Sequence, residues 1–472
     1  MHTIDDCIMR RRTFLKKSVA ATGMLAAVPL VSFGQTPVLT MVLRGGRAFY
    51  QGSWQRPDIG IDTAGKLHMG EAGTLQASTI LQLDNKVVSP GFIDILTDNT
   101  ANPEKSYAIV EKFKVSDGVT TALQMHGGSA QIAAYYKSFG AKPHWTNYGV
   151  STAVMRVRYA ATSLAERKRR VEQCLAEGAL GVSHSIEYQP TPYDEVLGYA
   201  KLARKYNRPL FLHLRYSSEG QELEGVDEAI SFARDSGARV HISHLHSTGG
   251  TFHMAEALTK LRQANAQGQE ITCCVYPYSY WATYLHSTRF DEGWQQRYGL
   301  TYNDLRLVGT GERLTAASFE KYRALKKLVA VPEGTLPMER TVDLALKESF
   351  CLIGSDGGIE YAANANSHPR GAGCFATAVR HALDIGMPLE SILNKMTLGP
   401  RQLLRPILDS RGILVSGATA DLAVLDPAAI NGTATVSNPN QFSKGIDLVI
   451  VNGKVAYADG NLKQMNGVVI KY

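Results

Sequence analysis

The sequence predicts an α/β protein, a (β/α)8 or TIM barrel that carries a small β-sandwich built from both chain ends. Between residues 90 and 405, strand-like and helix-like segments alternate eight times, as in a parallel barrel. The two flanking segments are instead rich in short strands and turns. The chain has 472 residues, which is enough for one large domain and a smaller one.

Residues 1–34 have the features of an export signal. A twin-arginine pattern at 11–16 is followed by an Ala-rich apolar run at 19–31 and by small residues at 32–34. That run is about 13 residues long, whereas a helix that spans a bilayer needs roughly 20. We therefore expect a twin-arginine signal peptide, a periplasmic or secreted protein and no stable membrane anchor. A buried N-terminal helix or a membrane anchor is the alternative.

Charge and cysteine content exclude some classes of protein. The full chain carries a net charge of +7, and removal of the signal leaves a mature chain near +4. We find no dense basic stripe, so we expect a small-molecule substrate and no nucleic acid. Five cysteines remain beyond the signal at irregular spacing, which is not a disulfide framework. Cys273, Cys274 and Cys351 lie in apolar runs and are expected to pack in the core. A homo-oligomer is possible.

The two ends of the chain predict the sandwich. Residues 36–89 contain short strand signals, and residues 406–472 repeat this texture. We expect the two segments to pair into one domain with the barrel, residues 90–405, inserted between them. The expected strands are 39–44, 47–50, 58–61, 67–69, 79–83, 417–426, 446–451, 454–457 and 468–470.

The eight units of the barrel follow in order. Strands are expected at 90–98, 120–125, 148–156, 179–186, 209–214, 239–244, 271–276 and 350–353. Helices are expected at 108–116, 162–177, 193–206, 225–236, 253–265, 341–348, 373–384 and 389–396. An irregular insertion at about 279–337 is long enough to cover the carboxyl ends of the strands as a lid. Its aromatic residues either stack on a substrate or form a core of their own: Tyr280, Trp281, Tyr284 and Trp294.

Four side chains with catalytic chemistry are expected at strand ends: His126, His213, His244 and Asp356. Such residues meet at one face of a barrel. Three imidazoles bind zinc and leave a position open for water, whose pKa the metal lowers toward neutrality. A nearby carboxylate takes the proton from that water and passes it to a leaving amine. A hydrogen-bonded role in the core is the alternative for each histidine.

Further residues flank these positions. Strand alternation would bring His246 toward the pocket, two residues after His244. Glu187 and Tyr188 follow the fourth strand and line the site, or form part of the solvated rim. Arg215 is placed to bind a substrate carboxylate with both of its amino groups, with a salt bridge at the rim as the equal alternative.

Taken together, these residues resemble the amidohydrolase superfamily, and within it the D-aminoacylase (N-acyl-D-amino-acid deacylase) branch. The resemblance implies a barrel with a β-sandwich, zinc, and deacylation of N-acyl-D-amino acids. It also makes Tyr278 a substrate-binding candidate. The matching segments are VSPGFID (88–94), GVTT (118–121), GALGVS (178–183), EY (187–188), HLR (213–215), ISH (242–244), VYPY (275–278), IGSDG (353–357), HPR (368–370), GIL (412–414) and DLAV (421–424).

The sequence also departs from that family. Leu96 and Asp98 stand where relatives carry a His-x-His metal pair. The metal-binding cysteine of the branch is missing from the segment 125–128, and His246 replaces a lysine. His213 and His244 match the metal ligands of strands five and six, and Asp356 matches the catalytic aspartate. We therefore expect one zinc ion rather than two, held by His126, His213 and His244.

Three functions fit these features. The first is an exported single-zinc amidohydrolase that cleaves the amide of an N-acyl-(D-)amino acid or a similar small molecule. The second is a lyase or isomerase on the same scaffold, because loss of the His-x-His pair can reflect a changed reaction. The third is a non-catalytic ligand-binding homologue. The combination of three histidines and an aspartate favours an enzyme.

Overall fold

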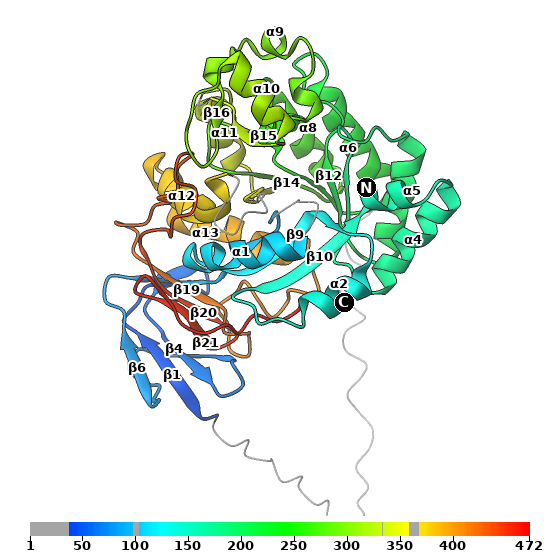
Figure 1. Ribbon diagram of the computed structural model, residues 1–472. Coiled ribbons are helices and arrows are strands. Elements are labelled where there is room, and N and C mark those ends of the chain that lie inside the picture. Colours follow the sequence, from blue (N-terminus) through cyan, green and yellow to red (C-terminus); the bar gives the residue numbers. More distant parts are fainter. Residues whose placement is uncertain (1–36, 98–102, 333, 358–367) are drawn as a thin grey trace, which may run out of the picture. The chain divides into compact units, whose positions relative to one another are not determined.

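The computed structural model describes residues 37–472, except 98–102, 333 and 358–367 (Figure 1). The expected export signal and Asp98 lie outside the described residues. From Val38 onward the chain forms one compact unit. A search of the described helices for one long and apolar enough to cross a bilayer finds none.

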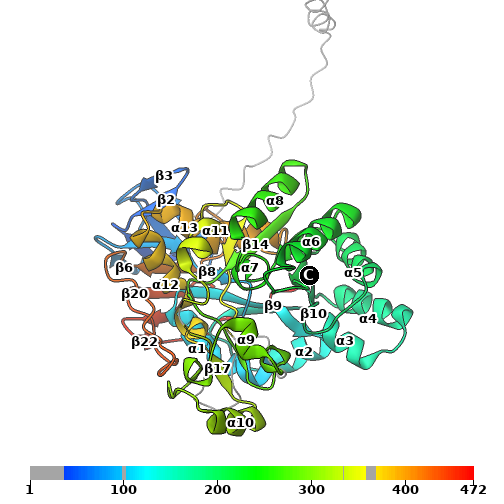
Figure 2. The ribbon, with the colours of Figure 1, turned by 90° about the horizontal axis from the view of Figure 1, so that it is seen from above.

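A single sheet of eight parallel strands forms the barrel, and its strands are neighbours in chain order (Figures 1 and 2). The bridge between Thr97 and Gly357 joins the first strand to the last and closes the ring. This confirms the predicted (β/α)8 barrel. The strands are β8 (Phe92–Asp94), β9 (Val119–Ser129), β10 (Asn147–Ala153), β11 (Val182–Ser185), β12 (Leu210–His213), β13 (Val240–Ile242), β14 (Ile271–Val275) and β18 (Cys351–Ile353).

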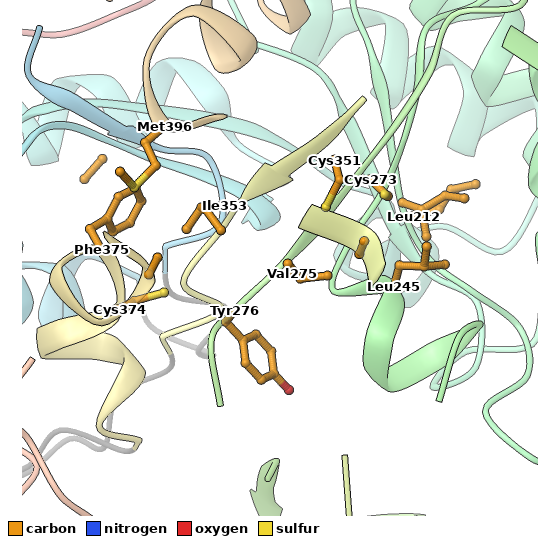
Figure 3. Close-up of a cluster of buried hydrophobic side chains, with 14 of the residues drawn as sticks. Leu212, Leu245, Cys273, Val275, Tyr276, Cys351, Ile353, Cys374, Phe375 and Met396 are labelled. Atoms are coloured by element: carbon orange, nitrogen blue, oxygen red, sulfur yellow. The ribbon is translucent and has the colours of Figure 1, made fainter. Parts of the chain in front are cut away.

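Helices connect these strands and cover the outside of the sheet (Figure 2). Their apolar faces pack on the strands in one large cluster. Figure 3 shows part of it, where Cys273 and Cys351 pack among aliphatic and aromatic residues, as expected for core cysteines. The helices are α1 (Pro103–Ser116), α2 (Ile132–Phe139), α3 (Val154–Ala160), α4 (Leu164–Ala176), α5 (Tyr193–Lys205), α6 (Glu222–Ser236), α7 (Leu245–Thr248), α8 (Met254–Ala266), α11 (Val342–Leu346), α12 (Arg370–Asp384), α13 (Leu389–Met396) and α14 (Leu398–Leu403).

Three strands end at least two residues earlier than their sequences predict. The first was expected to reach residue 98, but β8 ends at Asp94. The third was expected to reach residue 156, but β10 ends at Ala153 and α3 begins at once, because Val154 and Val157 bury one face at helical spacing. The sixth was expected to reach His244, but β13 ends at Ile242. His244 adopts a left-handed conformation (φ 33°, ψ 55°) and precedes the short helix α7.

The β-sandwich combines both chain ends, as predicted. One sheet has the order β5-β4-β1-β6, and the other has the order β22-β21-β20-β19-β7. Antiparallel pairing of β7 with β19 joins the two distant segments. The strands are β1 (Leu39–Arg44), β4 (Asp58–Asp62), β5 (Leu67–Gly70), β6 (Thr79–Gln82), β7 (Val87–Pro90), β19 (Leu422–Leu425), β20 (Ile446–Val451), β21 (Lys454–Ala458) and β22 (Asn461–Leu462), beside the hairpin β2 (Ala48–Tyr50) and β3 (Ser53–Gln55).

The segment 468–470 does not join the sandwich as a strand. Val469 instead bridges to Tyr148 at the start of β10, and the backbone N–H of Ile470 donates to the Tyr148 carbonyl at 2.7 Å. The barrel offers unpaired backbone groups at this point, and the tail satisfies them.

The insertion after β14 is an ordered subdomain rather than an irregular loop. Its three strands form an antiparallel sheet with the order β15-β17-β16. Trp294 stacks on Phe319 with ring centroids 5.5 Å apart, so part of the insertion forms its own core, while Trp281 and Tyr284 line a hollow. Its elements are β15 (Ala282–Tyr284), η1 (Thr288–Phe290), α9 (Trp294–Tyr298), η2 (Tyr302–Asp304), β16 (Arg306–Leu307), α10 (Ala316–Ala324), β17 (Leu328–Ala330) and η3 (Met338–Arg340).

Candidate metal centre and active site

Three histidines from different strands meet at the carboxyl end of the barrel. His126 lies within β9, His213 ends β12, and His244 follows β13. Each offers one ring nitrogen, and these three atoms all lie within 4.8 Å of one another. The two closest, Nδ1 of His213 and Nε2 of His244, are 3.2 Å apart. The barrel therefore brings together the three residues that were predicted from the sequence as metal ligands.

This geometry suits a tetrahedral metal ion. Two imidazole nitrogens bound to zinc at about 2.0–2.1 Å lie about 3.3 Å from each other, close to the separation of His213 and His244. The third nitrogen, on His126, lies within 4.8 Å of the other two, so it must move closer to them to coordinate the same ion. In the described part of the chain, no other group of three or more His, Cys, Asp or Glu side chains is arranged in this way.

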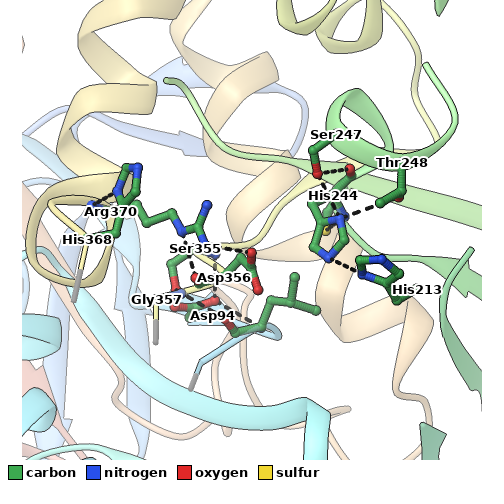
Figure 4. Close-up of polar contacts among 12 residues, drawn as sticks. Asp94, His213, His244, Ser247, Thr248, Ser355, Asp356, Gly357, His368 and Arg370 are labelled. Carbon is green, nitrogen blue, oxygen red and sulfur yellow. Dashed lines mark hydrogen bonds and ion pairs between the residues drawn. The ribbon is translucent and has the colours of Figure 1, made fainter. Parts of the chain in front are cut away.

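The remaining nitrogens of two of these rings are held by neighbours. Nε2 of His213 lies 2.7 Å from Oε2 of Glu187. Nδ1 of His244 lies 3.0 Å from the Ser247 hydroxyl (Figure 4). Because a carboxylate only accepts hydrogen bonds, His213 donates from Nε2 and presents a lone pair at Nδ1 when neutral. Such outer partners orient the ligands of metal sites.

Burial lowers the pKa of two histidines in the cluster. The removal of water from around His126 lowers its pKa to about 4, and burial together with the neighbouring histidines lowers the pKa of His244 well below its ordinary value. Both rings are therefore neutral near pH 7. Neutral imidazoles are the form that binds a metal ion.

Asp356 lies opposite the histidines and is clamped by one arginine. Arg370 donates from Nη2 to the Asp356 carboxylate at 2.8 Å and from Nε to the Asp356 carbonyl at 2.6 Å (Figure 4). Asp356 has a positive φ of 47°, which few non-glycine residues adopt. The guanidinium also lies over the Tyr276 ring, 4.4 Å from its centroid. This clamp fixes the direction of the carboxylate.

Glu187 connects the histidines to the insertion. Its carboxylate accepts from Arg289 at 3.0 Å and from Ser217 at 2.5 Å, besides His213. Burial raises the pKa of Glu187, but the charge of Arg289 and the bond from His213 outweigh burial and lower the pKa to about 2. Glu187 is thus an anion that orients a ligand, and Arg289 ties η1 of the insertion to the barrel.

The three histidines and Asp356 line a hollow of about 260 Å³. Both arginines line it, and neither Arg289 nor Arg370 was selected from the sequence. Arg370 stands in a matching segment, HPR, whereas Arg289 lies in an insertion that offered no periodic pattern. The walls also include Tyr188, as expected, together with Ser247, Tyr276, Trp281, Tyr284, His286 and His368.

Four predicted substrate-binding residues do not line this hollow. Glu187 is one of them, because its carboxylate bonds His213 and is not part of the lining. Arg215 donates to Glu228 at 2.7 Å and to the Thr191 carbonyl at 2.8 Å, so the salt bridge, the alternative left open, is what forms. His246 lies in α7 rather than on a strand, fully buried with its ring 4.0 Å from Tyr276. Tyr278 does not line the hollow; its hydroxyl lies 3.5 Å from that of Thr377, and its ring packs edge-on against the wall residue His368. The shorter β13 removes the alternation that pointed His246 at the pocket.

Among the described residues that follow β8, Leu96 is part of the apolar core. Leu96 is 1% exposed and belongs to an apolar cluster inside the barrel that includes Ile93, Cys274 and Leu352. A Cβ on Gly354 would meet Leu96 at 3.0 Å and the Cys274 sulfur at 3.1 Å, so this corner is tightly filled.

Just outside the barrel at this end, a buried ion pair joins the first and last strands. The Lys114 ammonium donates to Asp94 at 2.9 Å and to the Ser355 hydroxyl at 2.8 Å. Ser355 in turn donates to Asp94 from its hydroxyl at 2.5 Å and from its backbone N–H at 3.1 Å (Figure 4). Both charged side chains are fully shielded from solvent.

A parallel barrel with three converging histidines, a clamped aspartate and a two-sheet sandwich defines a class of metal-dependent barrel proteins. A family model for the amidohydrolase family matches residues 87–456 of this sequence. The chain therefore belongs to the amidohydrolase family.

Comparison with known proteins also confirms the predicted likeness to the D-aminoacylase branch. The chain is 27% identical over 479 residues to an N-acyl-D-glutamate deacylase of Alcaligenes xylosoxydans xylosoxydans, covering 88% of this chain and 93% of the relative. It is 28% identical over 447 residues to a D-aminoacylase of the same organism, covering 84% and 90%.

Solved structures share the fold. An N-acyl-D-glutamate deacylase from Bordetella bronchiseptica, complexed with zinc and a phosphonate inhibitor, aligns with a TM-score of 0.75 at 24% identity. A D-aminoacylase aligns with a TM-score of 0.77 at 21% identity. Both alignments cover 92% of this chain and 100% of the other.

Proposed function

We propose that this protein is an exported hydrolase that holds one zinc ion and cleaves the amide of an N-acyl-D-amino acid. The observation that carries the proposal is the cluster of three histidines beside a clamped carboxylate in one hollow. The curated relatives, which are named deacylases of N-acyl-D-amino acids, support the substrate class.

His126, His213 and His244 would hold the ion. A zinc ion in this position lowers the pKa of water and polarises a carbonyl group. Glu187 supports this arrangement because it holds Nε2 of His213 and leaves Nδ1 free to coordinate. The Ser247 hydroxyl donates its proton to the His244 carbonyl, so it can accept from Nδ1 of His244 and leave Nε2 free to coordinate.

Asp356 is the group that moves the proton. Its carboxylate lines the same hollow as the histidines. As a general base it accepts a proton from the attacking water, and as a general acid it returns that proton to the departing amine nitrogen. Arg370 is a positioning residue for this step, because its two hydrogen bonds hold both the side chain and the backbone of Asp356.

The carboxylate of the substrate would face the two guanidinium groups. Arg289 and Arg370 line the hollow, and each already bonds one carboxylate of the protein. Arginine has further N–H donors in the same plane, so each guanidinium can donate to a second anionic group.

The proposal of one ion rather than two rests on the apolar corner at β8. Leu96, Ile93 and Leu352 have no atom that coordinates a metal, and the Cys274 sulfur beside them accepts a hydrogen bond from the backbone N–H of His244. Asp98 lies outside the described residues. The single ion that we propose is therefore the one held by the three histidines.

The first experiment measures metal content and hydrolysis together. We expect about one zinc per chain in the purified protein and release of free D-amino acid from N-acetyl-D-amino acids. A His213→Ala, His244→Ala double variant is expected to lose both, and His253→Ala, at a partly exposed position, serves as the control. A metal-free wild type would overturn the mechanism. A product formed without uptake of water would instead identify a lyase or isomerase.

Export forms a separate part of the proposal, supported by the twin-arginine pattern at 11–16. Replacing Arg11 and Arg12 with lysine is expected to retain the protein in the cytoplasm, whereas the wild type is recovered from the periplasm or medium. Fractionation followed by immunoblotting measures this. Equal distribution of the two proteins would contradict the assignment.

A further inference from the structure

A second hollow opens beside the first at the carboxyl ends of β9, β10 and β11. Its volume is about 560 Å³, within the range of roughly 300–1,000 Å³ found for pockets that bury small organic ligands. Its floor is formed by residues at the strand ends, and α3 forms one side. The lining residues are His126, Gly127, Ala153, Met155, Arg156, Tyr159, Ser183, His184, Ser185 and Tyr188.

The two hollows meet at the metal centre. His126 and Tyr188 line both of them. The Tyr188 ring lies 4.8 Å from the ring of His213, with the two planes inclined at 47°. A group held by the histidine cluster therefore has one hollow on each side of it, separated by the Tyr188 ring.

The two hollows differ in their charged and apolar groups. The first carries two arginines, Arg289 and Arg370, which bond the carboxylates of Glu187 and Asp356. The second carries one half-buried arginine, Arg156, and an apolar wall formed by Ala153, Met155 and Tyr159. Two guanidinium groups match a substrate carboxylate better than one, and the apolar wall of the second hollow matches an acyl chain.

We infer that the second hollow binds the acyl group of the substrate. This inference rests on the proposed function. In an N-acyl-amino acid, the carboxylate is attached through the α-carbon to the amide nitrogen, and the acyl chain lies on the other side of the amide carbonyl. If the first hollow takes the carboxylate, the carbonyl substituent extends past Tyr188 into the second. The volume fits an acyl group with an aromatic ring, such as phenylacetyl, better than formyl or acetyl.

The test compares acyl groups on one amino acid. The ratio of kcat/KM for N-phenylacetyl-D-leucine to that for N-acetyl-D-leucine is measured for the wild type and for Met155→Trp, which fills the hollow. We expect the wild type to favour the larger substrate and the variant to reduce the ratio at least about tenfold, as pocket contacts do. Leu164→Trp places the same ring on the next helix, outside the hollow, and is the matched control.

A second variant keeps the test decisive if Met155→Trp misfolds. Ala153→Leu narrows the same hollow from β10 and is expected to lower the ratio in the same direction. An unchanged ratio in both folded variants would overturn the inference while leaving the proposed function intact.

Absence of all hydrolysis in the wild type would count against the proposed function instead. In that case, calorimetric binding of N-phenylacetyl-D-leucine decides the matter. Weakening of binding by at least about tenfold in Met155→Trp supports the hollow as the acyl site, and equal binding refutes it.

Discussion

The ends of β12 and β13 and the end of β8 lie on the same rim of one barrel, yet they have opposite chemistry. His213 and His244 present ring nitrogens to each other, with hydrogen bonds holding their far sides. At β8, Leu96 fills the interior, and Asp94 and Lys114 pair with each other outside it. One arc of the rim is thus built to bind a cation, and the other to close the barrel.

This contrast teaches that neighbouring strand ends of one barrel can carry different chemistry without a change in the fold. At β8 the polar chemistry persists, but as a buried network of Asp94, Lys114 and Ser355 that joins the first strand to the last. Ser355 precedes Asp356 directly, so the network that closes the barrel also supports the carboxylate of the active arc.

The largest effect is expected from breaking the active arc at Asp356. Asp356→Asn removes the proton acceptor but retains the shape of the side chain, so we expect kcat to fall about 10²–10⁴-fold with metal content unchanged. Asp343→Asn, at a pair with His381 on the outer helices, is the isosteric control. Steady-state kinetics with elemental analysis measures both quantities. Full turnover in the metal-loaded variant would remove Asp356 from the mechanism.

A smaller but substantial effect is expected from breaking the closing arc. Lys114→Met leaves the Asp94 carboxylate buried without its cation, which typically destabilises a protein by about 3–5 kcal/mol. Calorimetry should show a lower unfolding temperature than for Lys112→Met, a half-buried lysine on the same helix. Adding Asp94→Asn should recover part of the loss, because no buried charge then remains. A single variant as stable as the wild type would show that the pair does not hold the seam.

The comparison is sharpened by placing an imidazole in the closing arc. Leu96→His buries a polar ring among apolar neighbours, and an unsatisfied polar group costs about 1–3 kcal/mol. We expect lower stability and no second zinc, whereas Leu96→Met, which conserves volume, should be nearly neutral. Uptake of two ions by the histidine variant would show that this corner still accepts a metal.

The smallest effect is expected for the pH dependence of stability, at a structural histidine that lies outside the metal-binding cluster. His184, at β11, donates from Nε2 to Thr191, whose own hydroxyl donates to the Gln189 carbonyl. Burial lowers its pKa to about 3. The unfolded chain therefore takes up this proton first, and stability falls as pH decreases from about 6.5 toward 3, by about 1.4 kcal/mol per pH unit.

The measurement compares unfolding temperatures at pH 7.5 and pH 5. His184→Gln should show a smaller decrease than the wild type, because the glutamine does not titrate. His253→Gln, at a partly exposed ring, should follow the wild type. Identical decreases in all three proteins would mean that His184 does not contribute to acid sensitivity.

The sequence predicted the barrel and sandwich well because their signals are local. Short apolar runs between helical patterns mark the strands. His213 lies at the end of its strand and Asp356 just after its strand, as expected, whereas His126 lies within β9, which continues to Ser129. His246 was placed wrongly because the left-handed conformation of His244 follows an early end of β13. No pattern in the sequence predicts that conformation.

The residues that sequence reasoning missed act over long distances. Arg289 reaches Glu187 from an insertion 102 positions later in the chain, and Lys114 pairs with a serine 241 positions away. A charged residue on an amphipathic helix normally indicates a solvated face, so the burial of Lys114 could not be read from its neighbours. Such contacts depend on how distant elements pack.

The seam between β8 and β18 has a consequence for the order of folding. Asp94 and Ser355 are separated by 261 positions, and β7 must meet β19 across a still longer stretch of chain. Contacts between such distant residues carry a large loop-closure entropy and form slowly. We therefore expect closure of the ring to be a late kinetic event, completed only after nearly the whole polypeptide has been synthesised.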